Sequence, residues 1–282
     1  MSSLFSIEEH QYMALAMELA KKGRFTTSPN PNVGCVVVKN GRIIGQGWHK
    51  KAGTGHAEVN ALAELTYDQS QDATAYVTLE PCSHFGRTPP CAERLIEAGI
   101  TEVVIAMLDT NPLVSGNGVN MLKQAGIKVR VGLLEHDARA LNNGFFTRME
   151  MKRPFVQVKM ASSLDGKIAL ANGESKWITG SKARADVQKF RALSCAILST
   201  AQTVLADDAK LNVRVESLSF EYPLDEMNQE VRQPHRIILD SKSQITQKHL
   251  KQLSLFQKHS PITLVRIEKT GEFDKVDYVE EV

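Results

Sequence analysis

The sequence predicts a two-domain α/β protein, with a first domain over residues 1–150 and a second over residues 151–282. Helical and strand patterns alternate through the first domain, which is typical of a sheet covered by helices. Pro154 then interrupts the pattern near Lys152-Arg153-Pro154, and a new alternation begins. A length of 282 residues also fits one or two domains.

The elements of the first domain follow from periodicity and turn residues. Apolar residues at helical spacing predict a helix over 7–22 that ends at Gly23. Asn40-Gly41 between two apolar runs predicts a hairpin. The hairpin strands cover 33–39 and 42–48, further helices cover 56–65, 91–98, 118–125 and 135–151, and further strands cover 73–79, 102–108 and 128–134.

The second domain starts with an apolar run that predicts a strand over 155–160. A helix over 182–193 follows, with Ser181 as its N-cap. Further strands are expected over 195–199, 236–239 and 262–267. The polar, acidic stretch 216–233 has no period and predicts a long surface loop.

Composition indicates an ordinary globular protein, since 42% of residues are hydrophobic and 23% are charged. The net charge of +2 does not indicate nucleic-acid binding. We expect no secretory signal, no membrane span and no membrane partner, and therefore a cytoplasmic protein with reduced thiols. Cys35 and Cys195 each lie in an apolar run and are expected to be buried.

The motif with the clearest chemistry is His56-Ala57-Glu58, followed by Pro81-Cys82 and by Cys91. One imidazole and two thiolates can hold zinc and leave its fourth position open for water, as catalytic zinc sites do. This pattern is typical of zinc nucleobase deaminases, in which the glutamate moves protons and is not a ligand. The motif predicts His56, Cys82 and Cys91 as metal ligands and Glu58 as the catalytic acid/base.

Two other interpretations of these residues remain open. They could be a core histidine and two buried thiols, or a structural zinc site closed by His84 as a fourth ligand. The spacing is also unusual, because eight residues separate Cys82 from Cys91 where deaminases generally show Pro-Cys-x-x-Cys. The longer loop brings His84 and Arg87 to the mouth of the site, and arginine suits the phosphate of a nucleotide.

The loop 81–91, together with 26–34 and His56-Ala57-Glu58, resembles the bifunctional riboflavin-biosynthesis deaminase–reductase family. Segments 159–167, 173–179 and 203–208 extend this resemblance into the second half. The resemblance implies a cytidine-deaminase-like three-layer domain followed by a dihydrofolate-reductase-like α/β domain. It also implies Zn²⁺ and NADPH as cofactors, pyrimidine nucleotides as substrates, and a homo-oligomer.

The resemblance further implies which residues bind the ligands. The deaminase substrate is expected to contact Asn30, His49, His84 and Arg87. From the sequence alone, Trp177 could equally be a core aromatic and Arg191 an exposed helix charge. The expected NADPH-binding residues are Ala161, Trp177, Thr203, Asp207 and Ser241, and the expected reductase substrate-binding residues are Ser175, Arg191, Leu211 and Arg214.

One departure from the family concerns the end of the second domain. The family has a late Gly-rich loop with a nearby glutamate there, whereas this sequence runs to Val282 without such a loop. We therefore expect this domain to be incomplete at its C-terminus. One alternative is a deaminase with an inactive reductase half. The others are a nucleoside or tRNA deaminase and a zinc-stabilised binding module without catalysis.

Overall fold

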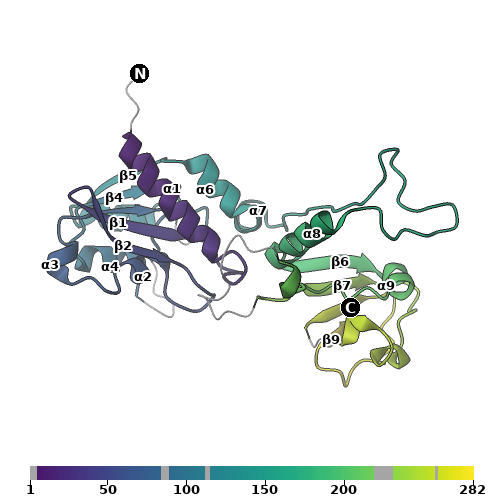
Figure 1. Cartoon of the computed structure of the whole chain (residues 1–282). Coiled ribbons are helices and arrows are strands. Elements are labelled where there is room, and N and C mark those ends of the chain that lie inside the picture. The colour runs from purple at the N-terminus through teal and green to yellow at the C-terminus, as the bar shows by residue number, and fades with distance from the viewer. Residues whose placement is uncertain (1–4, 84–88, 112–114, 219–230, 258–259) are drawn as a thin grey trace. The chain divides into compact units, whose positions relative to one another are not determined.

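The structure is a computed structural model that describes residues 5–83, 89–111, 115–218, 231–257 and 260–282. It divides into two compact units, Met1–Val158 and Lys159–Val282 (Figure 1). Each unit has a sheet of its own, of five strands in the first and four in the second.

The sheet of the first unit has the strand order β2-β1-β3-β4-β5. The strands β1 and β2 form the predicted antiparallel hairpin, with Lys39 opposite Arg42. The strand β3 is antiparallel to β1, whereas β3, β4 and β5 are parallel to one another. The bounds are β1 Gly34–Lys39, β2 Arg42–Trp48, β3 Thr74–Val77, β4 Glu102–Ile105 and β5 Lys128–Val131.

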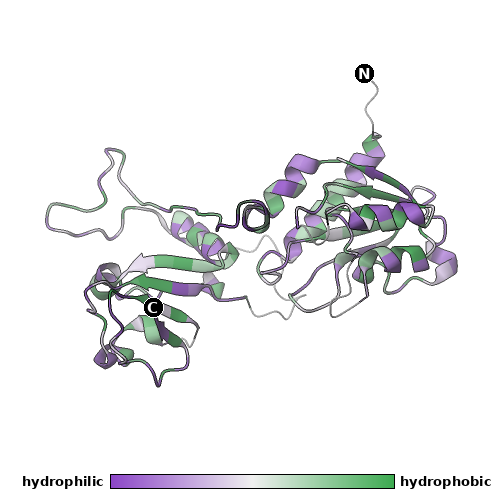
Figure 2. Cartoon of the chain, turned by 180° about the vertical axis from the view of Figure 1, so that it is seen from behind, coloured by the Kyte–Doolittle hydropathy of each residue, from purple (hydrophilic) through white to green (hydrophobic). Residues whose placement is uncertain are grey.

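Helices cover both faces of this sheet and give three layers. The helix α1 packs on one face, where Met13 and Ala16 meet Val36 and Val104 in one core cluster. The helices α2, α4 and α5 contribute to a second cluster on the other face. Figure 2 shows hydrophobic strands beneath helices that also carry hydrophilic residues. The bounds are α1 Ile7–Lys22, α2 Ala57–Ala61, α3 Tyr67–Ser70, α4 Cys91–Glu97 and α5 Asn117–Gln124.

The prediction of a single helix over 135–151 is wrong. Two helices, α6 (Glu135–Leu141) and α7 (Asn143–Met151), meet at Asn142, whose φ of −129° and ψ of 29° are not helical. The buried side chain of Asn142 forms hydrogen bonds with the distant residue Asn32. These contacts hold Asn142 at the junction between the two helices.

The second unit contains a parallel sheet with the order β6-β7-β8-β9. Its core cluster includes Val204, Ile238, Leu264 and Phe273. The bounds are β6 Ala196–Thr200, β7 His235–Leu239, β8 Ile262–Val265, β9 Val279–Glu281, α8 Ser181–Leu193 and α9 Ala201–Asp207, with 3-10 turns η1 Val215–Ser217, η3 Gln247–Leu250 and η4 Ser254–Phe256.

Three further predictions about the second half are wrong. Residues 155–160 form no strand, and Val156 and Val158 are exposed, because no neighbouring strand in the described structure pairs with them. The helix α8 begins with Ser181 and has the extended residue Gly180 as its N-cap. Cys195 is exposed at the start of β6, whose residues alternate between exposed and partly buried. Most of the predicted surface loop, residues 219–230, lies outside the described residues.

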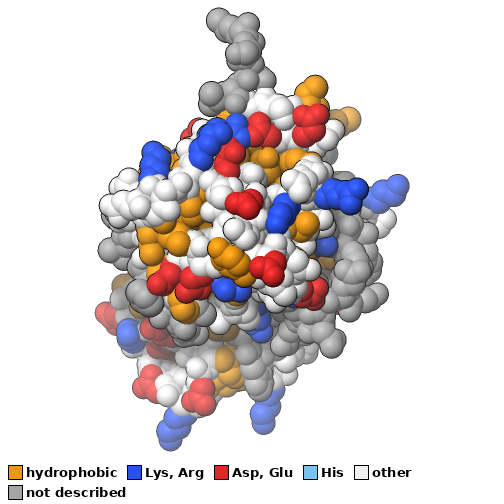
Figure 3. All heavy atoms as spheres, turned by 90° about the vertical axis from the view of Figure 1, so that its left-hand side faces the viewer, with side chains coloured by type: hydrophobic (Ala, Val, Ile, Leu, Met, Phe, Trp, Pro, Cys, Tyr) orange, Lys and Arg blue, Asp and Glu red, His pale blue; other side chains and the backbone are white. Residues whose placement is uncertain are grey.

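The surface has a mixed character. Figure 3 shows acidic, basic and hydrophobic side chains interspersed on one face, without a continuous area of one charge. Within the described ranges, no helix has both the length and the apolar character that crossing a bilayer requires.

Candidate metal centre and surrounding site

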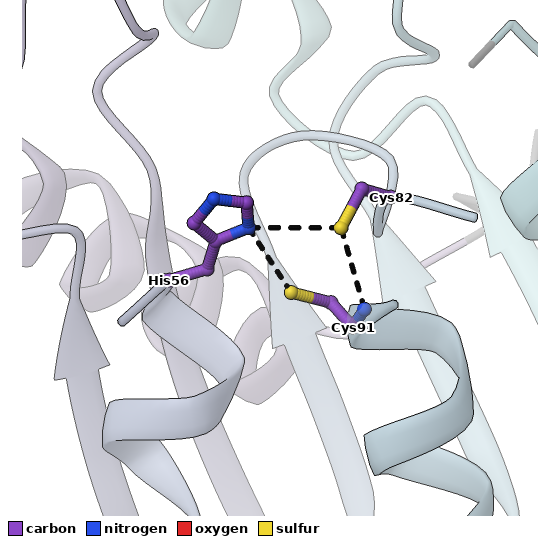
Figure 4. Close-up of side chains that lie close together, drawn as sticks. All are labelled: His56, Cys82 and Cys91. Atoms are coloured by element: carbon purple, nitrogen blue, oxygen red, sulfur yellow. Dashed lines mark hydrogen bonds between the residues drawn. The ribbon is translucent and has the colours of Figure 1, made fainter. Parts of the chain in front are cut away.

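Three chain segments bring His56, Cys82 and Cys91 together at one edge of the first sheet. His56 is the N-cap of α2, and Cys91 is the first residue of α4. Cys82 lies in the loop that leaves the carboxyl end of β3. Figure 4 shows the imidazole of His56 and the two thiols facing a common point. Loops at the carboxyl ends of parallel strands are common positions for functional sites.

The distances between these side chains suit a tetrahedral metal ion. The Nδ1 atom of His56 lies 3.2 Å from Sγ of Cys91 and 3.6 Å from Sγ of Cys82. All three ligand atoms lie within 4.8 Å of one another. Zinc bonds of about 2.0–2.1 Å to nitrogen and about 2.3 Å to sulfur place tetrahedral N and S ligands about 3.6 Å apart. One nitrogen and two sulfur donors fit zinc and leave a fourth position for water.

The surroundings of Cys82 favour the thiolate form that a zinc ligand requires. Its side-chain hydrogen bond with Cys91, with help from His56, lowers the pKa of Cys82 to about 4. The backbone N–H of Cys91 also donates to Sγ of Cys82 at 3.3 Å. The hydrogen bond with Cys82 and burial raise the pKa of Cys91. A bound divalent cation reverses this last effect, because it deprotonates a coordinating thiol.

Glu58 stands beside the three ligands and is only 2% exposed. Its Oε2 atom has no hydrogen-bond partner among the described residues. Burial raises the pKa of Glu58, with a further contribution from Cys82. A buried carboxyl group with an unused oxygen and a raised pKa is suited to accept a proton and return it near neutral pH.

A buried carboxylate holds the loop that carries Cys82. The Oε2 of Glu80 accepts hydrogen bonds from the N–H groups of Asp109 at 3.2 Å and Gly116 at 3.0 Å, and its Oε1 accepts one from Val119 at 3.1 Å. These contacts tie the loop to the first turn of α5. Gly118 lies so close that an added Cβ would stand 2.0 Å from the carbonyl oxygen of Pro81.

Two of the expected deaminase substrate residues lie against the metal centre. The ring of His49 is 5.2 Å from that of His56, and burial lowers the pKa of His49. Nδ2 of Asn30 is 3.1 Å from Nε2 of His49. The other two expected residues, His84 and Arg87, lie outside the described residues.

The expected NADPH residues lie at three places in the second unit. Thr203 lies in the first turn of α9, where its N–H donates to the N-cap Thr200 at 3.2 Å. Ser241 follows β7. The last residues of β6 and β7, Thr200 and Leu239, are neighbours in the sheet, so Thr203 and Ser241 lie near the same carboxyl end of these strands. Asp207 is at the other end of α9. Ala161 and Trp177 lie in the irregular, largely exposed segment 152–180, together with the expected substrate residue Ser175.

Three expected residues of the reductase substrate site come together. Arg191 donates to the carbonyl oxygen of Asn212 at 2.9 Å. Burial, with a smaller repulsion from Arg214, lowers the pKa of Arg191. Leu211, buried and with a φ of +52°, precedes Asn212. A cavity of about 130 Å³ beside them is lined by Lys210, Asn212, Arg214, Glu216, Arg236, Ser254 and Gln257.

The sequence did not indicate the supporting roles of Glu80 and Asn142. For Asn142 a local signal existed, because Asn142-Asn143-Gly144 is unfavourable inside a helix. For Glu80, only its position immediately before Pro81-Cys82 was suggestive, and its side-chain hydrogen bonds go to residues at least 29 positions away.

Two protein-family models match the chain. The first, described as the cytidine and deoxycytidylate deaminase zinc-binding region, matches residues 6–107. The second, described as the RibD C-terminal domain, matches residues 154–280.

Curated relatives and solved structures agree with these matches. The chain is 51% identical to riboflavin biosynthesis protein RibD of Haemophilus influenzae, over 99% of this chain and 73% of that protein. It is 52% identical to RibD of Escherichia coli, over 86% of this chain and 66% of that protein. The structure of Acinetobacter baumannii RibD superposes with a TM-score of 0.87 at 47% identity, covering 98% of this chain and 73% of that one.

Proposed function

This chain belongs to the RibD family of riboflavin biosynthesis proteins, and on that premise we propose that it catalyses two reactions of riboflavin formation. The first is hydrolytic deamination of 2,5-diamino-6-ribosylamino-4(3H)-pyrimidinone 5′-phosphate. The second is NADPH-dependent reduction of the ribosyl group of 5-amino-6-(5-phosphoribosylamino)uracil. The chain spans 66–73% of the length of the two relatives compared above.

The fold class predicted from the sequence agrees with this family. A cytidine-deaminase-like unit precedes an α/β unit that matches the reductase domain of RibD. The zinc-binding family region also includes His56, Cys82 and Cys91, all three of the candidate ligands. The cofactors are therefore zinc for the first unit and NADPH for the second.

The observation that carries the first activity is the buried carboxyl group of Glu58 beside the cluster of His56, Cys82 and Cys91. Zinc held there supplies a Lewis acid that makes a water molecule nucleophilic. Glu58 would accept the two protons of the water one after the other, passing the first to the ring nitrogen and the second to the departing amine. The water oxygen stays on the ring carbon, and ammonia leaves.

Asn30 and His49 contribute substrate contacts in the first unit. Nδ1 of His49 is 3.1 Å from the carbonyl oxygen of Gly55, so Nδ1 carries the hydrogen and Nε2 is the acceptor. The amide nitrogen of Asn30 then donates to Nε2, which leaves the Asn30 oxygen to receive a hydrogen bond from the substrate. His84 and Arg87 complete this set as contacts from the loop between the two cysteines.

In the second unit, Arg191 and Arg214 supply positive charge for the phosphate of the substrate, with Leu211 beside them. Ser175 contributes a contact from the separate segment 152–180. NADPH binds through Ala161, Trp177, Thr203, Asp207 and Ser241. Hydride transfer depends on the placement of the nicotinamide rather than on a reactive side chain. We also place the enzyme in the cytoplasm, in agreement with its four free cysteines. The family resemblance leads us to propose a homo-oligomer.

The experiment that tests this proposal supplies each substrate separately to the purified, zinc-loaded chain. Ammonia release from the diaminopyrimidinone nucleotide, and NADPH oxidation with the uracil nucleotide, are the expected results. A chain that releases ammonia but leaves NADPH unchanged would restrict the proposal to the first activity. A chain that releases ammonia from cytidine but not from the diaminopyrimidinone nucleotide would overturn the substrate assignment.

A further inference from the structure

The loop that carries Asn30 is held together by its own hydrogen bonds. The N–H of Asn30 donates to the carbonyl oxygen of Thr27 at 2.8 Å. The hydroxyl of Thr27 donates to Oδ1 of Asn32 at 2.7 Å. Residues 27–32 are therefore tied to one another, and a displacement of Asn32 is transmitted to Asn30.

The outer side of this loop is bound by the junction between α6 and α7. The N–H of Asn32 donates to Oδ1 of Asn142 at 2.7 Å, and Nδ2 of Asn142 donates to the carbonyl oxygen of Asn32 at 2.9 Å. This pair of bonds spans 110 residues of sequence. Two opposed hydrogen bonds between one amide side chain and one residue's backbone fix both its position and its orientation.

A second contact from α7 supports the same loop. Nη2 of Arg148 donates to the carbonyl oxygen of Pro29 at 3.2 Å. Asn142 is only 6% exposed, so its hydrogen bonds are protected from competition with water. The loop thus lies between the helix junction on one side and His49, adjacent to the metal centre, on the other.

The geometry points to Asn142 as a positioning residue for substrate binding in the deaminase unit. It holds Asn32, and through the cross-linked loop it sets the amide of Asn30 against His49 and the bound pyrimidine nucleotide. Asn142 contacts none of the three metal ligands in the described structure. Its effect is therefore on the binding of substrate and not on the binding of zinc. This inference rests on the proposed function of the site.

The test compares Asn142→Ala with Asn143→Ala, its exposed neighbour, in the zinc-loaded full chain. For Asn142→Ala we expect KM for the diaminopyrimidinone nucleotide to rise about 10-fold, the equivalent of about one lost hydrogen bond. The turnover number and the zinc content should change little. Asn142→Asp keeps the acceptor for the Asn32 N–H and loses the donor to the Asn32 carbonyl oxygen. Its KM should therefore lie between that of the wild type and that of Asn142→Ala. Asn143→Ala should match the wild type.

A double mutant separates positioning from general support. If Asn142 acts through Asn30, then Asn30→Ala combined with Asn142→Ala should bind substrate no worse than Asn30→Ala alone. Fully additive losses, an unchanged KM in Asn142→Ala, or zinc loss in that variant would overturn the inference.

Amide hydrogen exchange provides a measurement that does not depend on activity. The N–H groups of Asn30 and Asn32 should exchange faster in Asn142→Ala than in the wild type or in Asn143→Ala. A wild-type chain that released no ammonia would refute the proposed function, and the exchange rates would still decide whether Asn142 holds this loop. Equal exchange rates in all three proteins would refute the inference alone.

Discussion

The Nδ1 atom of His56 lies 3.2 Å from Sγ of Cys91, although 35 residues separate them in the chain. Each residue stands at the start of a helix, α2 or α4, at the same edge of the sheet. With Cys82 they form the group of ligand atoms whose spacing fits zinc. Helix starts hold these side chains in place, because the backbone there is fixed by the helices that follow.

Replacing Cys91 by serine should remove zinc. Serine lacks the thiolate that zinc prefers, so the affinity should fall by at least about 100-fold, more than the change of an outer-shell residue causes. Competition with a chromophoric chelator measures this change. Cys195→Ser is the matched control, because Cys195 is exposed and lies in the second unit. Equal zinc affinity in the two variants would contradict the ligand assignment.

Glu80→Gln should destabilise the first unit. The glutamine amide presents N–H groups to the backbone donors of Asp109 and Gly116, so at least one of the three bonds to Glu80 is lost. We expect a loss of about 1–3 kcal/mol in the free energy of unfolding, measured by urea denaturation. Glu97→Gln, at a largely exposed position, should cost much less. A similar cost for the two would show that Glu80 does not anchor the loop.

Arg130→Met should destabilise the protein in a pH-dependent manner. The hydrogen bond from Arg130 lowers the pKa of Glu9, and Arg130 also donates to Glu102 at 2.6 Å. Stabilisation by a carboxylate with a lowered pKa is present above its unfolded pKa of about 4.3 and is lost as the pH falls through the folded value. The variant should lose about 1–2 kcal/mol at neutral pH, and this difference should shrink as the pH falls below about 4.

Urea unfolding at several pH values checks this dependence. Arg94→Met, which removes an exposed pair with Glu97 separated by 3.7 Å, is the control and should cost little at any pH. A constant difference between Arg130→Met and the wild type across the acid range would contradict the expected role of Glu9.

Arg191→Ala should affect the second reaction and leave the first unchanged. Loss of a charged contact to phosphate should raise KM for the uracil nucleotide about 10- to 100-fold, while ammonia release stays at the wild-type rate. NADPH oxidation and ammonia release are measured in parallel. Lys182→Ala, on the exposed start of the same helix, serves as the control. A fall in ammonia release in Arg191→Ala would contradict the division of the two activities between the units.

The strands and most helices of the first unit could be predicted because their signals are local. Asn40-Gly41 marks a hairpin turn, with a φ above +50° at both residues. The break at Asn142 has only a weak local signal, Asn142-Asn143-Gly144, and the hydrogen bonds that hold Asn142 go to Asn32, 110 residues earlier. A local apolar pattern also predicted a strand over 155–160. A strand needs a neighbouring strand to pair with, and a local pattern does not show whether one is present.

The candidate site shows the same difference. The spacing of His56, Glu58, Cys82 and Cys91 carries a chemical meaning in the sequence, because zinc and proton transfer need those residue types. Glu80 and Asn142 act through backbone groups of distant residues. Their side chains would suit a surface position equally well, and only the folded structure reveals their partners.

The central claim, that Glu58 moves protons at a zinc site formed by His56, Cys82 and Cys91, is tested most directly with Glu58→Gln. Glutamine has nearly the same shape but cannot accept the proton, and Glu64→Gln, at an exposed position six residues further along the sequence, is the control. Zinc content and ammonia release are measured on the same samples. We predict full zinc content and a fall in the rate of ammonia release of about 10²- to 10⁴-fold. Ammonia release at the wild-type rate in zinc-loaded Glu58→Gln would contradict the claim.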